Sequence, residues 1–139
     1  MTQALTLLLV EDEALIRLGL KETLVEGGFD VIEAANGEKA LSEIESDASR
    51  FRGLITDIEL GAGPDGWEIA RRGRELIPNL PVVYISGHGA ADWPSKGVPN
   101  SLIVNKPFAP VQIITAISTL LVEADSRGAS IGGAPASPP

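Results

Sequence analysis

The feature that most constrains this chain is an alternation between two hydrophobic patterns. Short apolar runs, such as 5–10 and 53–58, are separated by longer segments in which apolar residues recur at helical spacing. A continuous apolar run indicates a strand that is covered on both faces, as strands of parallel sheets are. The repeated strand and helix units therefore predict an α/β fold with a doubly wound parallel sheet and right-handed crossovers.

Five such units can be placed on the sequence, which predicts a five-stranded sheet in one domain of residues 1–124. The flavodoxin-like arrangement of such a sheet has the strand order 2-1-3-4-5. Asn36 is the expected N-cap of the second helix. We expect strands at 5–10, 29–34, 53–58, 81–86 and 101–105, and helices at 13–26, 37–48, 66–77 and 110–123.

Two segments depart from this regular pattern. The span 87–100 should hold helix four, but it contains three glycines and two prolines. Because a proline in a helix interior costs about 3 kcal/mol, we expect a loop or a single helical turn there. Residues 125–139 are rich in Gly, Ala, Ser and Pro, and cannot bury enough apolar surface to offset their ordering entropy. They are predicted to form a disordered tail.

Apolar spacing also predicts which side of a helix faces the sheet. In the first helix the apolar residues at roughly helical spacing are Leu15, Ile16, Leu18, Leu20, Leu24 and Val25. In the last helix the predicted buried stripe is Val111, Ile114, Ile117, Leu120 and Leu121.

Composition excludes several classes of function. The net charge of -8 disfavours direct binding to nucleic acid or to an anionic membrane, since both would repel the chain. The absence of cysteine removes disulfides, thiolate nucleophiles and cysteine-ligated metals. No basic segment followed by an apolar leader begins the sequence, and no apolar run approaches about 20 residues. We therefore expect a cytoplasmic protein that binds a protein partner or a cation.

Carboxylates follow the first and third expected strands. Glu11 and Asp12 come directly after 5–10, and Asp57 lies at the end of the third apolar run. Strands one and three are neighbours in the predicted order, so their carboxyl ends should form one pocket. Clustered oxygen ligands suit Mg²⁺, and a carboxylate beside Mg²⁺ can attack a phosphorus centre. Taken singly, the same residues could be solvated acids or a helix-capping acid.

Two more polar residues follow the fourth and fifth expected strands. Ser86 ends one and Lys106 follows the other. A hydroxyl and an ammonium around a phosphoryl group would complete a clamp opposite the metal. Each has an ordinary alternative, as a turn residue and a surface charge. All of them fall at successive strand ends of one sheet, which favours a shared site.

The ordered set of motifs resembles the receiver domain of two-component response regulators. The resemblance covers residues from 5 to about 123. Its matched pieces are Leu8-Leu9-Val10-Glu11-Asp12-Glu13, Asp57, Asp65-Gly66, Ser86-Gly87 and Lys106-Pro107-Phe108.

The resemblance implies a role for each site residue. Asp57 would accept a phosphoryl group from a histidine kinase or a small phosphodonor. Asp12, Asp57 and the backbone carbonyl of Glu59 would bind Mg²⁺ directly, and Glu11 would act through water. Lys106 would bridge to the phosphate, and its peptide bond to Pro107 would be cis.

Ser86 would turn toward the phosphate on activation. The chain would then be a phosphoacceptor signalling domain rather than an enzyme, and a histidine phosphotransfer protein is a second possible partner.

Some features depart from the family pattern. Ile103 replaces the aromatic residue commonly found three places before the lysine, and helix four is degraded. Both changes disfavour dimerisation through helix four, and the sequence leaves the oligomeric state open. With no output domain expected, the chain would be a stand-alone phosphoryl shuttle or a phosphorylation-gated binding module. A pseudo-receiver that never takes a phosphoryl group is the alternative. An aspartate-nucleophile hydrolase is disfavoured, since Asp57-Ile58-Glu59 lacks a second aspartate.

Overall fold

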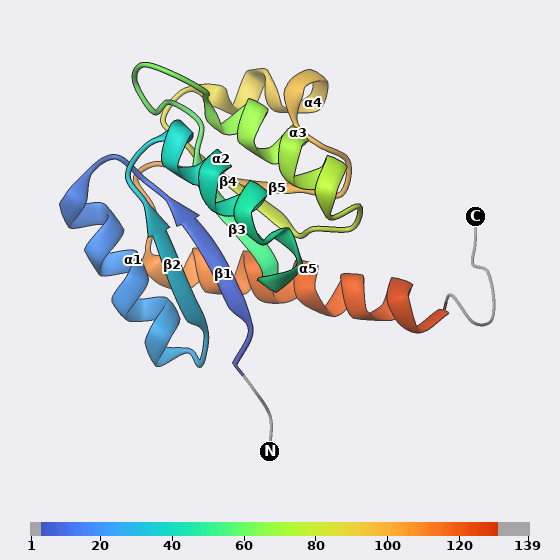
Figure 1. Ribbon diagram of the computed structural model, residues 1–139. Coiled ribbons are helices and arrows are strands. Elements are labelled where there is room, and N and C mark those ends of the chain that lie inside the picture. Colours follow the sequence, from blue (N-terminus) through green and yellow to red (C-terminus); the bar gives the residue numbers. More distant parts are fainter. Residues whose placement is uncertain (1–3, 131–139) are drawn as a thin grey trace.

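The protein is a three-layer sandwich with a parallel sheet in the middle (Figure 1). The computed structural model describes residues 4–130, and side chains as far as residue 126. The five strands lie in the order β2-β1-β3-β4-β5, and every neighbouring pair is parallel. The predicted α/β class, strand number and strand order are confirmed.

The elements follow one another in the expected alternation. The strands are β1 (Thr6–Val10), β2 (Asp30–Ala34), β3 (Phe51–Asp57), β4 (Val82–Ser86) and β5 (Leu102–Asn105). The α-helices are α1 (Ala14–Glu26), α2 (Gly37–Ser46), α3 (Gly66–Leu76), α4 (Trp93–Lys96) and α5 (Pro110–Ser130). Two 3-10 turns, η1 (Ala48–Arg50) and η2 (Gly89–Ala91), precede β3 and α4.

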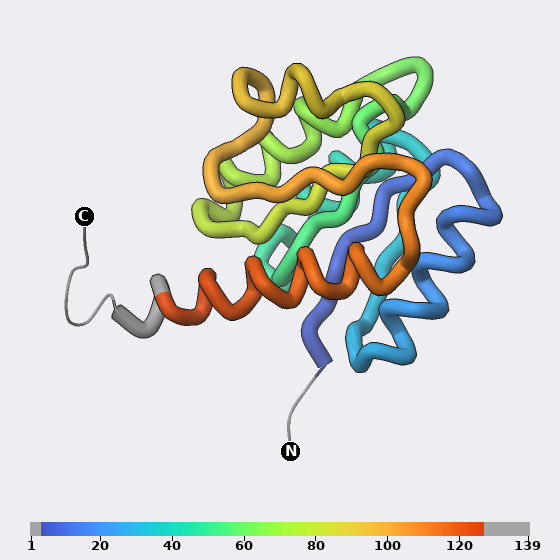
Figure 2. Tube along the Cα trace, turned by 180° about the vertical axis from the view of Figure 1, so that it is seen from behind, coloured from blue at the N-terminus to red at the C-terminus, as the bar shows by residue number. Residues whose placement is uncertain are grey.

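Each face of the sheet has its own hydrophobic core. Alternate β1 residues point to opposite faces, so Leu8 and Val10 belong to one core while Leu7 and Leu9 belong to the other. The first core packs against α2 and α3, and the second packs against α1 and α5, which cross the sheet on the far side (Figures 1 and 2). Continuous apolar strands are required because both faces are covered.

The helical stripes are only partly as predicted. In α1, Leu20 and Leu24 are fully buried, but Leu15 and Leu18 are 83% and 50% exposed. In α5, Ile117 is fully buried, whereas Val111, predicted to be buried, is 61% exposed. The prediction for Val111 was therefore wrong. Val111 lies in the first turn of α5, and its side chain is on the side of the helix that faces solvent.

Helix four is reduced to the turn η2 and the four-residue helix α4, as its glycines and prolines predict. Tyr84, a fully buried residue of β4, accepts a hydrogen bond from the backbone N–H of Val98 at 3.1 Å. The indole of Trp93 donates to the hydroxyl of Ser101 at 2.9 Å, and that hydroxyl donates to the Val98 carbonyl. These side chains, rather than helical hydrogen bonds, hold the irregular segment against the sheet.

The last helix is longer than predicted. It continues to Ser130, whereas the sequence predicted an end at Glu123. Adding a residue to an existing helix costs little, and residues 124–130 contain no proline that would stop it. Residues 131–139, the rest of the predicted disordered tail, lie outside the described residues. Within the described part of the chain, no helix is both long and apolar enough to cross a membrane.

We predict that Tyr84→Phe destabilises the protein by about 1–3 kcal/mol, because the buried N–H of Val98 would lose its acceptor. Urea denaturation measures the free energy of unfolding. Thr119→Val is the matched control, since it removes a hydroxyl from an exposed position of α5. Equal effects of the two substitutions would contradict the role assigned to Tyr84.

Candidate functional site

The candidate site lies at the carboxyl edge of the sheet. The parallel register pairs Val10 with Thr56 and Asp57 with Ile85, so β1, β3 and β4 end side by side. Lys106 follows β5, and its backbone N–H donates to the carbonyl of Ser86 at 2.8 Å. Residues that are far apart in the sequence therefore converge because their strands end at one edge.

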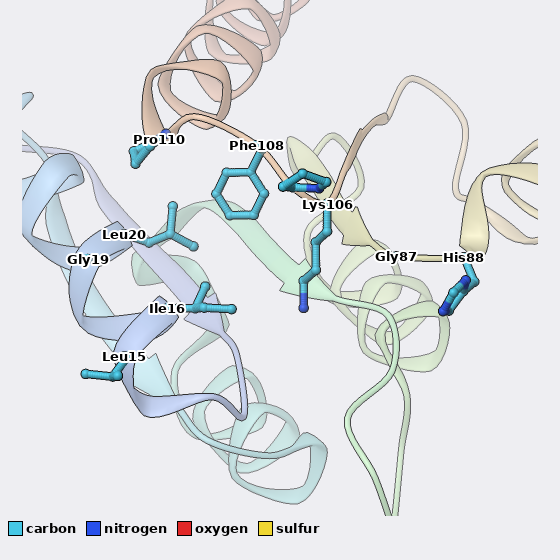
Figure 3. A pocket seen from close by; sticks show the side chains of 10 residues that line it. Leu15, Ile16, Gly19, Leu20, Gly87, His88, Lys106, Phe108 and Pro110 are labelled. Atoms are coloured by element: carbon cyan, nitrogen blue, oxygen red, sulfur yellow. The ribbon is translucent and has the colours of Figure 1, made fainter.

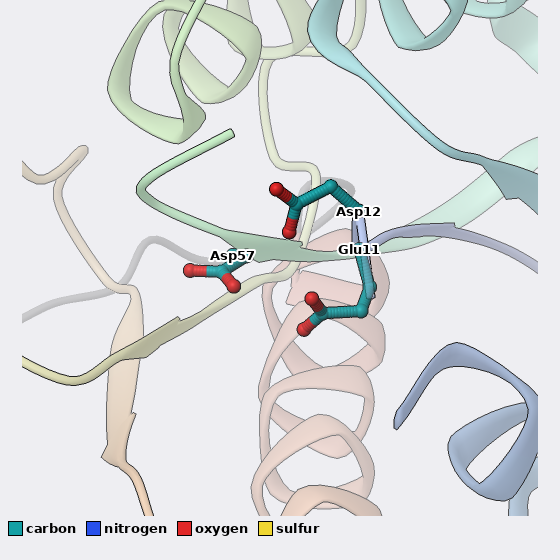
Figure 4. Close-up of side chains that lie close together, drawn as sticks. All are labelled: Glu11, Asp12 and Asp57. Carbon is teal, nitrogen blue, oxygen red and sulfur yellow. The ribbon is translucent and has the colours of Figure 1, made fainter. Parts of the chain in front are cut away.

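The three carboxylates form a compact cluster. Glu11, Asp12 and Asp57 each contribute an oxygen, and these atoms all lie within 4.8 Å of one another (Figure 4). Glu11 is completely buried and Asp57 is 3% exposed, whereas Asp12 is exposed to solvent. The site therefore consists of two buried acids, Glu11 and Asp57, and one solvent-exposed acid, Asp12.

Lys106 neutralises part of this charge. Its Nζ atom lies 2.7 Å from Oδ2 of Asp57 and 3.8 Å from Oε1 of Glu11. Burial lowers the pKa of Lys106, but the hydrogen bond and negative charge of Asp57 outweigh this effect, so the pKa is raised overall. The ammonium therefore stays charged beside the carboxylates, where it can also stabilise a phosphoryl oxygen.

Glu11 is the member of the cluster with incomplete polar contacts. Its Oε2 accepts a hydrogen bond from the backbone N–H of Glu13 at 3.0 Å, but Oε1 is buried without a hydrogen-bond partner. Burial raises the pKa of the Glu11 carboxyl to about 7, and the charge of Asp57 adds to this rise. An orphaned buried oxygen beside two further carboxylates fits a hard divalent cation such as Mg²⁺.

Asp57 is held by the loop that follows β3. The backbone N–H of Glu59 donates to its Oδ1 at 3.2 Å. Gly66 opens α3 directly behind Asp57, and a Cβ atom there would lie 2.4 Å from the Asp57 carbonyl oxygen. Only glycine permits this approach. The sequence motif Asp65-Gly66 marked the position but did not reveal the contact, although a glycine directly after a helix-capping acid was a usable signal.

Ser86 lies at the same edge but makes other contacts. Its hydroxyl accepts hydrogen bonds from the backbone N–H groups of His88, at 2.9 Å, and of Gly89. The hydroxyl therefore caps the turn η2.

The Lys106–Pro107 peptide bond is cis, as the family resemblance implied. Glu59 is exposed, and the use of its carbonyl as a metal ligand stays a prediction.

An apolar groove borders the charged cluster. Its volume is about 570 Å³, and Leu15, Ile16 and Leu20 of α1 line one side (Figure 3). Phe108 lies across from them, and the Lys106 side chain runs past the Phe108 ring in this view. The groove was not predicted, because the exposure of Leu15 depends on how α1 packs against its neighbours.

The fold, the acidic pocket and Lys106 together define a phosphoacceptor signalling domain rather than an enzyme. Residues 7–118 match the family model of the response regulator receiver domain, and the chain belongs to that family. Receiver domains take part in two-component signalling with histidine kinases. Their acidic triad is the typical Mg²⁺ site, which agrees with the cluster of Glu11, Asp12 and Asp57.

Individual relatives place the chain within this family. The response regulator receiver protein CpdR of Brucella abortus (strain 2308) is 31% identical over 120 residues, which cover 85% of this chain and 98% of CpdR. The transcriptional activator protein ExaE of Pseudomonas putida is 33% identical over 119 residues. That match covers 83% of this chain but only 54% of ExaE, so the chain spans about half the length of that relative.

Solved structures agree with the fold. A response regulator receiver protein from Sinorhizobium medicae WSM419 superimposes with a TM-score of 0.84 at 47% identity, covering 87% of this chain and 97% of that one. The receiver domain of the hybrid histidine kinase CckA gives a TM-score of 0.70 at 28% identity and covers 84% of this chain.

The raised pKa of Glu11 predicts that metal-free wild type becomes less stable as the pH rises from about 4.5 to about 7. The unfolded chain releases this proton near pH 4.5, whereas the folded protein keeps it to about pH 7. The folded state then binds more protons, so the free energy of unfolding falls with rising pH, by up to about 3 kcal/mol. Glu11→Gln, which cannot ionise, should lack this loss.

The measurement is urea denaturation in EDTA at pH 5 and pH 8. Glu22→Gln, which removes an exposed carboxylate of α1, is the control and should follow wild type. An identical pH dependence in wild type and Glu11→Gln would contradict the prediction.

Proposed function

We propose that this chain accepts a phosphoryl group on Asp57 from a histidine kinase, in a Mg²⁺-dependent reaction, and signals through protein partners. The observation that carries the proposal is the 2.7 Å contact of Lys106 with Asp57 inside a carboxylate cluster. A buried carboxylate that lies beside both an ammonium and two further carboxylates able to hold a cation matches the needs of phosphoryl transfer.

In the transfer step, an oxygen of Asp57 attacks the phosphorus of the donor's phosphohistidine. The new P–O bond forms as the P–N bond breaks, and the imidazole leaves with the electron pair of that bond. When bound, Mg²⁺ screens the negative charge between the carboxylate and the phosphoryl oxygens. Lys106 would stabilise a phosphoryl oxygen, and the buried position of Asp57 fixes its direction of attack.

The residues proposed to hold Mg²⁺ are Asp12, Asp57 and the carbonyl of Glu59, with Glu11 acting through a water molecule. Asp12 is the exposed acid of the cluster, so it can bind an entering hydrated ion. Oε1 of Glu11, which has no hydrogen-bond partner, offers an acceptor to a water molecule in the ion's hydration shell. The donor set consists of oxygens only, as Mg²⁺ requires.

Ser86 supplies the proposed route from phosphorylation to signalling. If its hydroxyl turned to a phosphoryl oxygen on Asp57, the N–H groups of His88 and Gly89 would lose their acceptor. Unpaired backbone donors are costly, so the turn η2 would have to rearrange. The short helix α4 follows η2 directly and would move with it.

The proposed partners are a histidine kinase and, for onward transfer, a histidine phosphotransfer protein. The net charge of -8 disfavours nucleic acid and anionic membranes. The reduced α4 disfavours dimerisation through the helix-four face.

The match to 98% of CpdR supports a stand-alone receiver, acting in the cytoplasm as a phosphoryl shuttle or as a binding module. Pull-downs with and without phosphorylation distinguish these two roles.

We predict that acetyl phosphate with Mg²⁺ adds one phosphoryl group to wild type and none to Asp57→Asn. Asp57 is the buried nucleophile of the cluster, and the amide cannot replace it. Intact-protein mass spectrometry measures the addition, and the same incubation with EDTA should prevent it. An unmodified wild type would instead favour a pseudo-receiver that binds its partners without phosphorylation.

The apolar groove is the proposed contact surface for the phosphodonor protein. It opens beside Lys106, and Leu15 at its rim is 83% exposed. A donor helix that places apolar side chains in this groove would bring its phosphohistidine to Asp57. A small phosphodonor such as acetyl phosphate needs no such contact, so the two kinds of donor should respond differently to changes at the rim.

We therefore predict that Leu15→Glu slows phosphotransfer from autophosphorylated histidine kinases by tenfold or more, roughly the loss of one apolar anchor. Labelling by acetyl phosphate should stay unchanged. The measurement is transfer from a panel of purified kinases at short times. Val122→Glu, at an exposed apolar position of α5 that is 66% exposed, is the control. If both variants match wild type with every kinase that phosphorylates it, the groove is not the donor surface.

A further inference from the structure

Ion pairs join α1 to β2 near the acidic loop, which we define as residues 11–13 between β1 and α1. Nε of Arg17 lies 3.2 Å from Oε1 of Glu33, and Nζ of Lys21 lies 2.9 Å from the other carboxylate oxygen, Oε2. The pKa of Glu33 is lowered, chiefly by the hydrogen bond from Lys21, so Glu33 remains ionised. One carboxylate thus holds two basic side chains of the same helix.

Arg17 also reaches the backbone of the candidate metal site. Its Nη1 donates to the carbonyl oxygen of Glu11 at 2.9 Å. This carbonyl belongs to the peptide that links Glu11 to Asp12, so its orientation sets the direction in which Asp12 leaves the end of β1. The rigid guanidinium therefore connects Glu33 to the acidic loop through two fixed hydrogen bonds.

Other contacts also anchor this loop, and one of them is the backbone N–H of Arg17, which donates to the carbonyl of Glu13 at 2.9 Å. The N–H of Glu11 donates to the carbonyl of Ala34 at 3.2 Å, and the N–H of Glu13 donates to the Glu11 side chain at 3.0 Å. The bond from the N–H of Glu13 uses a carboxylate of the cluster itself. Arg17 is thus a partner of the Glu11–Asp12 peptide that comes from outside the acidic loop.

From these contacts we propose that Arg17, braced by Glu33, is a positioning residue that aims the Glu11–Asp12 peptide so that its carboxylates bind Mg²⁺. The proposal rests on the Mg²⁺-dependent function inferred above and names residues outside the cluster that the cation site requires. Outer partners that orient metal ligands typically change metal affinity by about 10–100-fold when they are lost.

Electrostatics alone predicts the opposite effect of removing Arg17. The guanidinium binds the backbone of Glu11, a member of the carboxylate cluster, and its positive charge repels a divalent cation there. Its loss should therefore make the pocket more negative and tighten Mg²⁺ binding. Positioning predicts weaker binding, because the peptide would lose its outside anchor. The sign of the change in affinity therefore distinguishes the two roles.

Lys21 provides the matched control. It lies one turn further along α1, carries the same charge and pairs with the same carboxylate of Glu33. Its described contacts do not include the Glu11 carbonyl, which Arg17 binds. Lys21→Met therefore removes a positive charge and one contact of Glu33 while leaving the anchor of the acidic loop in place.

The experiment measures Mg²⁺ dissociation constants by isothermal titration calorimetry for the full chain carrying Arg17→Met, Glu33→Gln or Lys21→Met. We expect roughly tenfold weaker binding for Arg17→Met, a smaller loss for Glu33→Gln, and unchanged or tighter binding for Lys21→Met. Binding by Arg17→Met that equals or exceeds that of wild type would overturn the proposal. Urea denaturation establishes that each variant is folded under the conditions of titration.

Arg17→Lys gives an independent reading if Arg17→Met does not fold. It keeps the charge, but a single ammonium cannot reproduce the planar fork that joins Glu33 to the Glu11 carbonyl. Weaker Mg²⁺ binding is again expected, and wild-type affinity would overturn the proposal. In acetyl phosphate labelling, saturating Mg²⁺ should restore the rate of the Arg17 variants.

Failure of the proposed function is distinct from failure of this inference. A wild type that neither binds Mg²⁺ nor becomes labelled would overturn both. A wild type that does both, beside an Arg17→Met variant of equal affinity, would overturn only the role of Arg17.

Discussion

The burial of two carboxylates side by side is the constraint on which this structure depends. Glu11 and Asp57 are both nearly inaccessible to solvent, and their oxygens lie within the 4.8 Å cluster. Two unit charges at that distance repel by roughly 3 kcal/mol at an effective dielectric constant of about 20. Lys106 offsets part of this repulsion. Burial, together with the charge of Asp57, raises the pKa of the Glu11 carboxyl. The pocket is therefore arranged to gain from a bound cation.

The scaffold keeps these charges in place through rigid backbone packing. The carboxyl ends of β1 and β3 are adjacent. Both strands contribute side chains to the two hydrophobic cores, one on each face of the sheet, and this packing fixes their positions. Gly66 lets α3 begin against the backbone of Asp57. Asp57 is the last residue of β3, and Glu11 and Asp12 directly follow β1, so the rigid sheet holds all three acids close together.

On the β4 and β5 side of the site, hydrogen bonds to side chains hold the irregular segment between the two strands. Ser86 caps η2, and a buried hydroxyl of Tyr84 holds the segment before β5 through one backbone N–H. On β5, Ile103 lies directly opposite Tyr84 in the sheet, where the family pattern has an aromatic residue. Tyr84 of β4 supplies an aromatic ring inside the core here, and its centroid lies 4.7 Å from that of the Trp67 ring. A signal from Asp57 would pass through Ser86 and η2.

The α/β class, the strand order, the reduction of helix four and the grouping of Glu11, Asp12, Asp57 and Lys106 could all be predicted from the amino-acid sequence. Apolar runs and strand-end positions are local patterns, and residues that follow neighbouring strands of a parallel sheet meet at its carboxyl edge. Three features follow from packing instead: Leu15 and Val111 are exposed, α5 continues to Ser130, and Arg17 binds both Glu33 and the Glu11 carbonyl. These features depend on how one element packs against another, and helical spacing within a single segment carries no information about its neighbours.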